Sequence, residues 1–216
     1  HLNVKIGATH AGISVGEDGA SHQCNEDIAL MRTIPGMTIV VPADDIEARE
    51  AVRAAYETDG PFYLSFGRLA VPVINDRPDY HFELGKGSIV REGTDLALIA
   101  CGLEVGEALQ AAARLEEDGI SARVINMHTI KPLDRALLIR SAADCGRVVT
   151  VEEHSIIGGL GSAVAETLAE EYPAKLLRIG IRDRFGESGP AAELLHKYQL
   201  DAEGIYRQIR AWVSEL

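Results

Sequence analysis

NVKIGATHAGISVGEDGASHQCNEDIALM, residues 3–31, decides the fold, because it runs from one regular element through a long loop into another. Apolar and polar residues alternate over residues 3–8, which predicts a strand. Asn25 is a candidate N-cap for a helix that ends before Pro35. The loop between them, residues 9–24, follows the carboxyl end of the strand, where open parallel sheets gather their ligands. The stretch therefore predicts a strand, a functional loop and a helix, in that order.

Residues 9–24, named here the site loop, contain two histidines and an aspartate: His10, Asp18 and His22. The loop also has three glycines, which allow positive φ and close approach of the backbone to a ligand. Imidazole titrates near neutral pH, so this composition suits acid–base work on a polar substrate. Each histidine alone is explained equally well as a loop residue bonded to a backbone carbonyl. The three residues together favour a site.

A metal centre is a second interpretation of this loop. His10, Asp18, His22 and Cys24 are all ligand types, but the loop lacks the paired CxxC or HxxxH spacing that identifies zinc. We therefore predict no metal site. The chain has three cysteines, an odd number without paired spacing, so we expect reduced thiols rather than disulfides.

Strands and helices alternate along the rest of the chain. Apolar runs predict strands at residues 37–41, 62–66, 96–100, 122–126, 148–151 and 176–181. Periodic patterns predict helices at residues 45–57, 105–115, 134–143, 163–170, 191–198 and 203–213. This order predicts an α/β fold of two consecutive three-layer αβα units with mainly parallel sheets. We expect domains at residues 1–68 and 85–216, joined by a linker at residues 69–84 that carries two prolines.

Two of the predicted helices begin with an aspartate cap. Asp134 caps one, and either Asp44 or Asp45 caps the helix that ends near residue 57. The latter helix is predicted to bury a stripe made of Ile46, Val52, Ala55 and Tyr56.

Arg68 follows the strand predicted at residues 62–66 and lies beside Gly67. This position is at the same end of the predicted sheet as the site loop. A guanidinium there can bind a phosphate through two parallel hydrogen bonds. Composition alone favours the other interpretation, a surface salt bridge.

The bulk composition excludes several classes of protein. A chain of 216 residues with 46% hydrophobic residues can bury a sizeable core. Its formal net charge of -12 argues against nucleic acid and anionic membranes as partners. No apolar run approaches the length of a membrane span and no signal peptide opens the sequence, so we expect a cytoplasmic protein. The sequence starts at a histidine rather than a methionine, and we expect an N-terminal part to be missing.

Residues 156–163, IIGGLGSA, follow a predicted strand in the manner of a dinucleotide-binding loop. The GxGxxG spacing is not met, because Val164 occupies the third glycine position. No acidic residue clearly ends the next strand at the distance that such a site requires. We therefore prefer close packing of a helix on the sheet.

The sequence resembles the thiamine diphosphate-dependent transketolases over nearly its whole length. The motifs of the first half are GATHAGISVGEDGASHQ at residues 7–23, NEDIALMRTIPGMTIVVPAD at 25–44 and LSFGR at 64–68. Those of the second half are TIKPLD at 129–134, VVTVEEHSIIGGLGSAVAE at 148–166 and FGESGPAAELL at 185–195. The resemblance implies the end of a pyrimidine-binding domain followed by a transketolase C-terminal domain, in which His128 and His154 are structural.

The resemblance also implies a reaction and roles in it. Transketolases pass a two-carbon ketol unit from a ketose phosphate to an aldose phosphate, and thiamine diphosphate supplies the electron sink. By match to the family motif, His22 lies beside the aminopyrimidine and assists proton movement. Asp18 binds a substrate hydroxyl, while His10 and Arg68 hold the distal phosphate. Ala11 replaces the acid that usually follows the first histidine, so no substrate contact is assigned there.

The residues that hold the diphosphate and Mg²⁺ in this family lie outside the sequence. We therefore expect the chain to be inactive alone and to need an N-terminal transketolase subunit or domain, in a homodimer or a heterotetramer. Two alternatives stay open. In the first, the chain is part of a related thiamine enzyme, such as a deoxyxylulose-phosphate synthase or a 2-oxo acid dehydrogenase β subunit. In the second, it is a non-catalytic dimerisation module.

Overall fold

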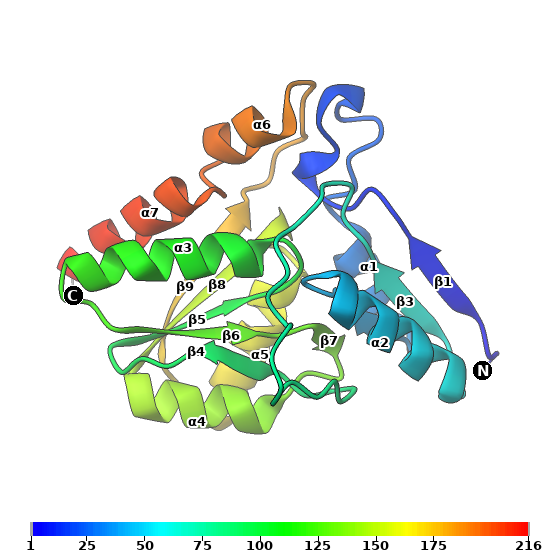
Figure 1. Cartoon of the computed structure of the whole chain (residues 1–216), viewed down its shortest axis with the longest axis horizontal. Helices are drawn as coiled ribbons and strands as arrows, with labels where there is room; N and C mark the ends of the chain where they lie inside the picture. Colours follow the sequence, from blue (N-terminus) through cyan, green and yellow to red (C-terminus); the bar gives the residue numbers. More distant parts are fainter. Residues whose placement is uncertain (1, 216) are drawn as a thin grey trace.

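The computed structural model describes residues 2–215, which form two mixed, mainly parallel sheets flanked by helices (Figure 1). The first sheet has the order β1-β3-β2-β7, made of β1 (Lys5–Ala8), β3 (Phe62–Ser65), β2 (Thr38–Val40) and β7 (Thr129–Lys131). The second has the order β4-β6-β5-β8-β9, made of β4 (Ser88–Arg91), β6 (Ala122–Asn126), β5 (Leu96–Ala100), β8 (Arg147–Ser155) and β9 (Lys175–Ile181). Only the edge strands β7 and β4 run antiparallel to their neighbours. The predicted fold class is confirmed.

The helices cover both faces of the second sheet. α3 (Glu104–Glu117) and α7 (Ala202–Ser214) pack on one face, and α4 (Arg135–Cys145) and α5 (Leu160–Glu171) on the other (Figure 1). Alternate residues of β5 accordingly enter different cores: Leu98 packs in the cluster under α3 and Ile99 in the cluster over α4. The remaining helices are η1 (Ile13–Asp18), a 3-10 helix, α1 (Asp27–Arg32), α2 (Asp45–Glu57) and α6 (Ala191–Lys197).

Aspartate side chains cap α2 and α4. The side chain of Asp44 accepts the backbone N–H of Glu47 at 2.9 Å, and that of Asp134 accepts the N–H of Leu137 at 3.0 Å. The predicted cap at Asp134 is thus confirmed, and of the two candidates for α2 the cap is Asp44. The prediction for Asn25 was wrong, since α1 begins at Asp27 and Asn25 instead offers its carbonyl to the N–H of Ser155.

The buried stripe predicted for α2 was wrong for two of its residues. Val52 is 51% exposed and Tyr56 is 85% exposed. The face of α2 that packs on the sheet instead carries Glu47, Ala51 and Ala55, which follow one another at four-residue spacing. Because this row begins with the charged Glu47, a search for apolar periodicity does not detect it.

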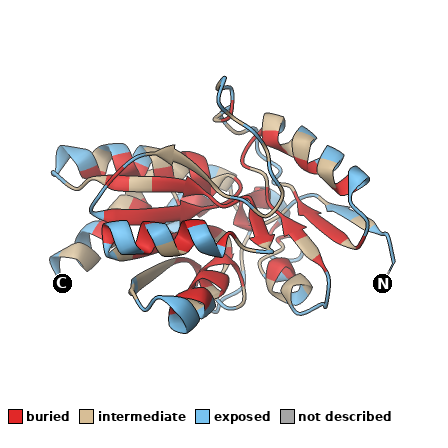
Figure 2. Cartoon of the chain, turned by 90° about the horizontal axis from the view of Figure 1, so that it is seen from below, coloured by how far each residue is buried: buried red, intermediate tan, exposed pale blue. Residues whose placement is uncertain are grey.

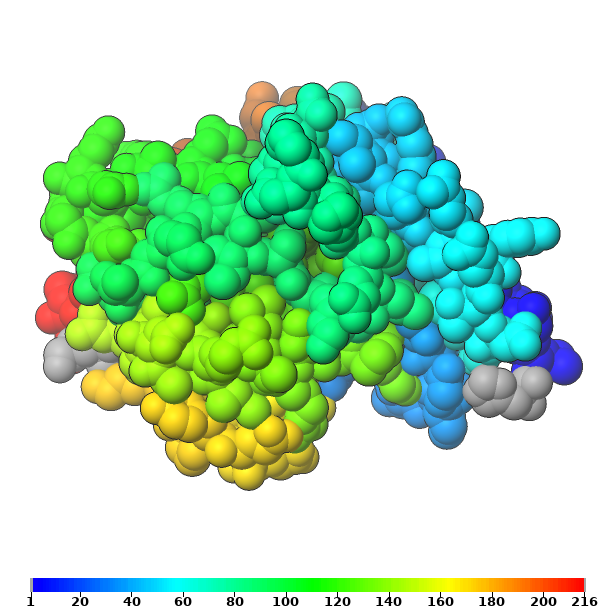
Figure 3. All heavy atoms as spheres, turned by 60° about the horizontal axis from the view of Figure 1, so that its bottom comes forward, coloured from blue at the N-terminus to red at the C-terminus, as the bar shows by residue number. Residues whose placement is uncertain are grey.

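The two halves of the chain are interlocked. β7, a three-residue strand that the sequence pattern did not predict, pairs with β2 and so adds a strand from the second half to the first sheet. Residues 69–84 have no helix or strand, yet they are packed across the join between the halves (Figure 3). Asp44 accepts the N–H groups of Ile74 and Asn75, and Phe82 stacks on His128 with ring centroids 4.5 Å apart.

Buried residues gather in the strands of both sheets and on the helix faces that pack against them (Figure 2). Among residues 2–215, no helix is both long and apolar enough to cross a membrane.

Candidate active site

The site loop begins where β1 ends and leads into α1, as predicted. β1 and β3 are parallel, so the loop and the segment after β3 leave the sheet at the same edge. Backbone hydrogen bonds tie the two together: the N–H of Ala11 donates to the carbonyl of Phe66 at 3.2 Å, and that of Gly12 to Cys24 at 2.9 Å. The loop is therefore a closed structure on a strand edge.

Second-half residues press closely on the glycines of the loop. Gly12 and Gly19 have positive φ, and a Cβ at either would collide with a side chain of the second half, that of Glu153 or Ser188 respectively. α6 packs against η1, beside the loop (Figure 1). The buried Gln23 amide donates to the carbonyl of Glu187 at 2.8 Å. The glycines are thus required by close packing as well as by backbone conformation.

Asp18 and Arg68 meet at the edge of the site loop. The Arg68 guanidinium donates through Nη1 to the Asp18 carboxylate at 2.8 Å and to the Val15 carbonyl at 2.7 Å. Their side chains are 46% and 40% exposed, so the pair contributes at most about 1 kcal/mol to folding. The structure is therefore compatible with both interpretations of Arg68, a surface salt bridge and a phosphate-binding residue, because the salt bridge leaves other N–H groups of the guanidinium available for an anion.

Both candidate histidines are exposed on the same loop. Nδ1 of His10 lies 2.9 Å from Thr9 Oγ1, and Nδ1 of His22 lies 3.0 Å from Ser21 Oγ. Within residues 2–215 neither ring forms an ion pair, and each keeps Nε2 for a ligand. His10 also has a positive φ of 65°, an uncommon conformation for a residue other than glycine.

The described residues offer no ligand set for a metal. Among residues 2–215, no group of three or more histidine, cysteine, aspartate and glutamate side chains lies close enough to hold an ion. Cys24 is half-buried, and burial together with the nearby Asp27 carboxylate raises the pKa of its thiol to about 11. Such a thiol is protonated at neutral pH, which agrees with a packing role.

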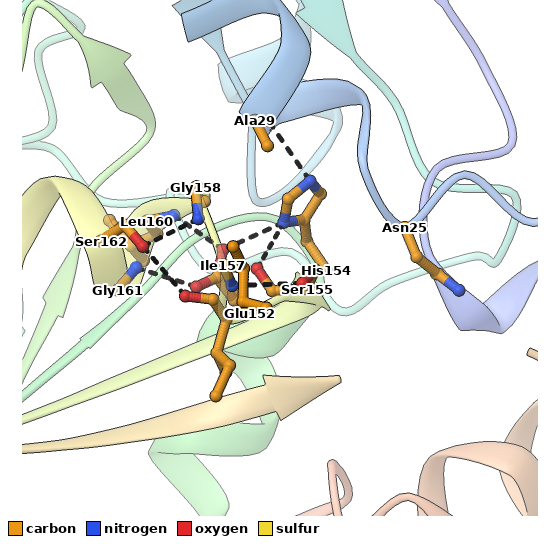
Figure 4. Close-up of polar contacts among 12 residues, drawn as sticks. Asn25, Ala29, Glu152, His154, Ser155, Ile157, Gly158, Leu160, Gly161 and Ser162 are labelled. Carbon is orange, nitrogen blue, oxygen red and sulfur yellow. Dashed lines mark hydrogen bonds and ion pairs between the residues drawn. The ribbon is translucent and has the colours of Figure 1, made fainter. Parts of the chain in front are cut away.

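Of three consecutive polar residues near the end of β8, Glu152, Glu153 and His154, one supports the site loop, and the sequence pattern did not identify it as such. Glu153 accepts the backbone N–H of Ser14, in the site loop, at 3.1 Å. Glu152 and His154 point elsewhere along the join (Figure 4). The only signal in the sequence was a pair of glutamates and a histidine ending an otherwise apolar strand.

His154 connects β8 to α1 and is 3% exposed. Its Nδ1–H donates to the Ser155 carbonyl at 2.7 Å, so Nε2 is free to accept the N–H of Ala29 at 3.4 Å (Figure 4). Burial lowers the pKa of His154, which favours this neutral ring. His128 is also buried, and burial lowers its pKa to about 4. Both rings are therefore suited to structural roles.

Glu152 occupies the start of α5, after the glycine run. Its carboxylate accepts the N–H groups of Leu160 at 2.7 Å and Gly161 at 2.8 Å (Figure 4). Burial raises its pKa to about 8, against the effect of these bonds. A Cβ on Gly158 would collide with Ala29 of α1. The glycine run thus allows α1 to pack closely against it. The N–H groups at the start of α5, which a nucleotide phosphate would need, are already bonded to the Glu152 side chain.

Comparison with known proteins identifies two domain families in the chain. The family described as "Transketolase, pyrimidine binding domain" matches residues 1–73, and "Transketolase, C-terminal domain" matches residues 85–205. A Methanocaldococcus jannaschii protein named "Putative transketolase C-terminal section" is 52% identical over 96% of this chain and 66% of its own length. An apulose-4-phosphate transketolase subunit of Phocaeicola vulgatus is 42% identical over 99% of this chain and 68% of its own.

A solved structure described as "Split gene transketolase, inactive beta4 tetramer" superposes with a TM-score of 0.89 at 50% identity. The match covers 97% of this chain and 67% of that one, so the chain spans about two thirds of the length of these relatives. The two family matches together cover both halves of the chain in the order found here. The chain therefore belongs to the transketolase family and corresponds to its C-terminal section, with the pyrimidine-binding and C-terminal domains.

Proposed function

We propose that the chain is the C-terminal subunit or fragment of a transketolase. It contributes to the thiamine diphosphate-dependent transfer of a two-carbon ketol unit from a ketose phosphate to an aldose phosphate. The observation that carries this proposal is the Asp18–Arg68 pair on a loop that also exposes two histidines, at the carboxyl edge of a parallel sheet. The names of the relatives support it independently.

The phosphate end of the substrate is assigned to Arg68 and His10. Nη1 of Arg68 is used by Asp18 and Val15, and the other guanidinium nitrogens remain available for a bidentate contact with phosphate. Among residues 2–215 the His10 ring makes one hydrogen bond, between Nδ1 and Thr9 Oγ1, so its Nε2 can donate to the same group. The contact with Asp18 fixes the guanidinium in place before the substrate arrives, which lowers the entropy cost of binding.

The reacting end of the substrate is assigned to Asp18 and His22. An ionised carboxylate has several lone pairs, so Asp18 can accept a sugar hydroxyl while it holds Arg68. His22 moves a proton at the substrate oxygen, since imidazole is the side chain suited to proton transfer near neutral pH and this ring is exposed. When bound, thiamine diphosphate supplies the electron sink for the carbon that is transferred. Because the family resemblance places the residues that hold Mg²⁺ and the diphosphate in an N-terminal part, we assign both to a partner.

We assign the partner as an N-terminal transketolase subunit or domain. The solved relative is described as an inactive tetramer of β subunits, and the chain spans only part of each relative. Within this chain, we propose that residues 1–68 act as the partial pyrimidine-binding domain and 85–216 as the C-terminal domain, with 69–84 linking them. A homodimer or a heterotetramer with the partner completes the enzyme.

Complementation tests the proposal. The chain, a candidate N-terminal subunit, thiamine diphosphate and Mg²⁺ are assayed for ketol transfer between sugar phosphates, with each protein omitted in turn. Transfer that needs both proteins supports the proposal, whereas turnover of pyruvate or another 2-oxo acid instead would identify one of the related thiamine enzymes. Binding of the two proteins without any turnover would favour the dimerisation module.

Asp18→Asn adds a test of the site itself. The variant removes the carboxylate charge but not the shape, and we expect kcat/KM for ketol transfer to fall at least about tenfold. The matched control is Asp45→Asn, because Asp45 also forms an exposed pair with an arginine, Arg49, at 2.6 Å on α2. An unaffected transfer rate in Asp18→Asn would contradict the assigned role.

A further inference from the structure

Glu153 reaches from the second half of the chain to the site loop. It lies at the end of β8, and its carboxylate accepts the N–H of Ser14, 139 residues earlier in the chain, at 3.1 Å. Gly12 lies so close that a Cβ there would collide with this carboxylate. Gly67 lies near it from the other side, since a Cβ there would be 3.9 Å from Oε1. Glu153 thus sits between the site loop and the residue that precedes Arg68.

We propose that Glu153 is a positioning residue for the site loop, and that its carboxylate sets the placement of Asp18 and His10 relative to Arg68. The proposal rests on the function proposed above for that loop. It gives the C-terminal domain a direct part in the site, in addition to supporting the fold. Glu153 itself touches no substrate in this assignment.

The start of η1 explains why a carboxylate is needed. Gly12, the residue before η1, has no side chain that could cap it, and its own N–H donates to the Cys24 carbonyl. The first N–H groups of a helix otherwise lack acceptors, and a negative charge next to them is favourable. Glu153 therefore acts as a cap supplied from the second domain. η1 is interrupted at Gly16, where φ is 84° and ψ is -121°, so the cap holds the first turn of η1 directly and acts on Asp18 through the turn that follows.

Other acidic side chains surround Glu153. It faces Ser14 of η1, Asp27 of α1 and the buried Glu104 of α3. Burial raises the pKa of Glu153 to about 7, and the bonds from Ser14 oppose this shift. The bonds from Ser14 and burial thus act on the pKa of this carboxyl in opposite directions, and the effect of burial is the larger.

The experiment uses hydrogen exchange and assembled-enzyme kinetics on Glu153→Gln. The amide keeps the size of the side chain but not its charge. We expect amide exchange to rise at least about fivefold in peptides that cover residues 10–18, with exchange in β5 and β8 unchanged. With the partner, thiamine diphosphate and Mg²⁺ present, we expect kcat/KM for ketol transfer to fall about tenfold, because a misplaced site costs this much or more.

Glu107→Gln is the matched control, since Glu107 of α3 is a half-buried glutamate of the same domain that accepts the backbone N–H of Ala202 at 2.7 Å, at the start of α7 rather than in the site loop. It should leave loop exchange and the kinetics of the assembled enzyme unchanged. Unchanged loop exchange in Glu153→Gln would overturn the proposal, as would a uniform rise throughout the chain. Faster loop exchange, in an assembly whose wild type shows no ketol transfer, would preserve the positioning role and refute the proposed function.

Gly12→Ala provides a second approach if Glu153→Gln does not fold. The new Cβ collides with the Glu153 carboxylate and disturbs the contact from the loop side. We expect the same local rise in amide exchange in Gly12→Ala. The double variant Gly12→Ala with Glu153→Ala should show a smaller rise than the sum of the two single variants, because without the Glu153 carboxylate the new Cβ no longer collides. Additive effects in this double-mutant cycle would contradict a direct contact.

Discussion

At the scale of single residues, the site combines an exposed ion pair with buried support. Asp18 and Arg68 meet in water-accessible surroundings, where their attraction adds little to folding, and we propose that the pair serves ligand binding. Behind them, Glu153 bonds to the loop backbone from a half-buried position. A carboxylate in such surroundings is a stronger constraint on the backbone than one in water. The exposed residues are free to bind while the loop beneath them is held.

Arg68→Ala tests the phosphate contact. Charge-assisted hydrogen bonds contribute about 1.5–3 kcal/mol, so we expect KM for phosphorylated sugars to rise about 10- to 100-fold in the assembled enzyme. The fall in kcat should be smaller, because the phosphate is remote from the reacting carbon.

The control for Arg68→Ala is Arg49→Ala, which breaks an exposed ion pair of similar geometry on α2. It should leave the kinetics unchanged. Equal KM values for wild type and Arg68→Ala would show that Arg68 is a surface salt bridge only.

At the scale of elements, α1 is fixed by the turn that leads into α5. Arg32 donates to the Gly158 carbonyl at 2.7 Å, and Ala29 donates to His154. Gly158 has a φ of 84° and lies against Ala29, so a larger residue cannot fit without moving the helix. The glycines of this turn thus let a helix of the first domain approach the second sheet.

Gly158→Ala should destabilise the protein more than a glycine substitution in open space. We expect a loss of about 1–3 kcal/mol from overpacking in addition to about 1 kcal/mol from the left-handed backbone. Gly146→Ala is the matched control, because Gly146 has a φ of 70° and a Cβ there would meet no atom of residues 2–215 within 4 Å. Urea unfolding midpoints compare the two variants, and equal losses would refute the packing argument.

At the scale of the whole molecule, the join between the halves is acidic and buried. Glu104, Glu152 and Glu153 come from two elements of the second domain, and burial raises the pKa of each. β7 and residues 69–84 close the same join from the other side. The charge of these glutamates is therefore coupled to the docking of one domain on the other.

This coupling predicts that stability falls as the pH rises from about 6.5 to about 8. In the unfolded chain these glutamates ionise near pH 4.5, whereas in the native state Glu153 keeps its proton to about pH 7 and Glu152 to about pH 8. The native state binds more protons over this window, so the free energy of unfolding decreases with pH. Buried His128 and His154 act in the opposite direction only below about pH 6.5, where the unfolded chain takes up their protons.

Thermal melts of the whole chain across this pH window measure the slope. A variant with both Glu152→Gln and Glu153→Gln should show a flatter profile than the wild type. A wild-type Tm that rises across the window would contradict the assigned ionisation.

The sequence by itself determined the features that depend on local chemistry. The sequence pattern identified Asp134 as a cap and narrowed the cap of α2 to Asp44 or Asp45, because the bonds that such caps make span three residues. Apolar runs identify the long strands, and the alternation of elements predicts the parallel sheets. Asp18 and Arg68 could be placed near each other because parallel strands end at one edge, although their functional roles stay predictions.

Only the tertiary structure decided the rest, for one physical reason: contacts between distant segments leave no periodic trace in either segment. β7 is three residues long and exists because β2 offers an edge. Val52 and Tyr56 have the spacing of a buried stripe but face away from the sheet, since Glu47 occupies the buried row. Glu153 supports a loop 139 residues away, and nothing local distinguishes it from Glu152, which turns to the start of α5 instead. Tertiary packing, rather than the local sequence pattern, determines which segment each of these residues contacts.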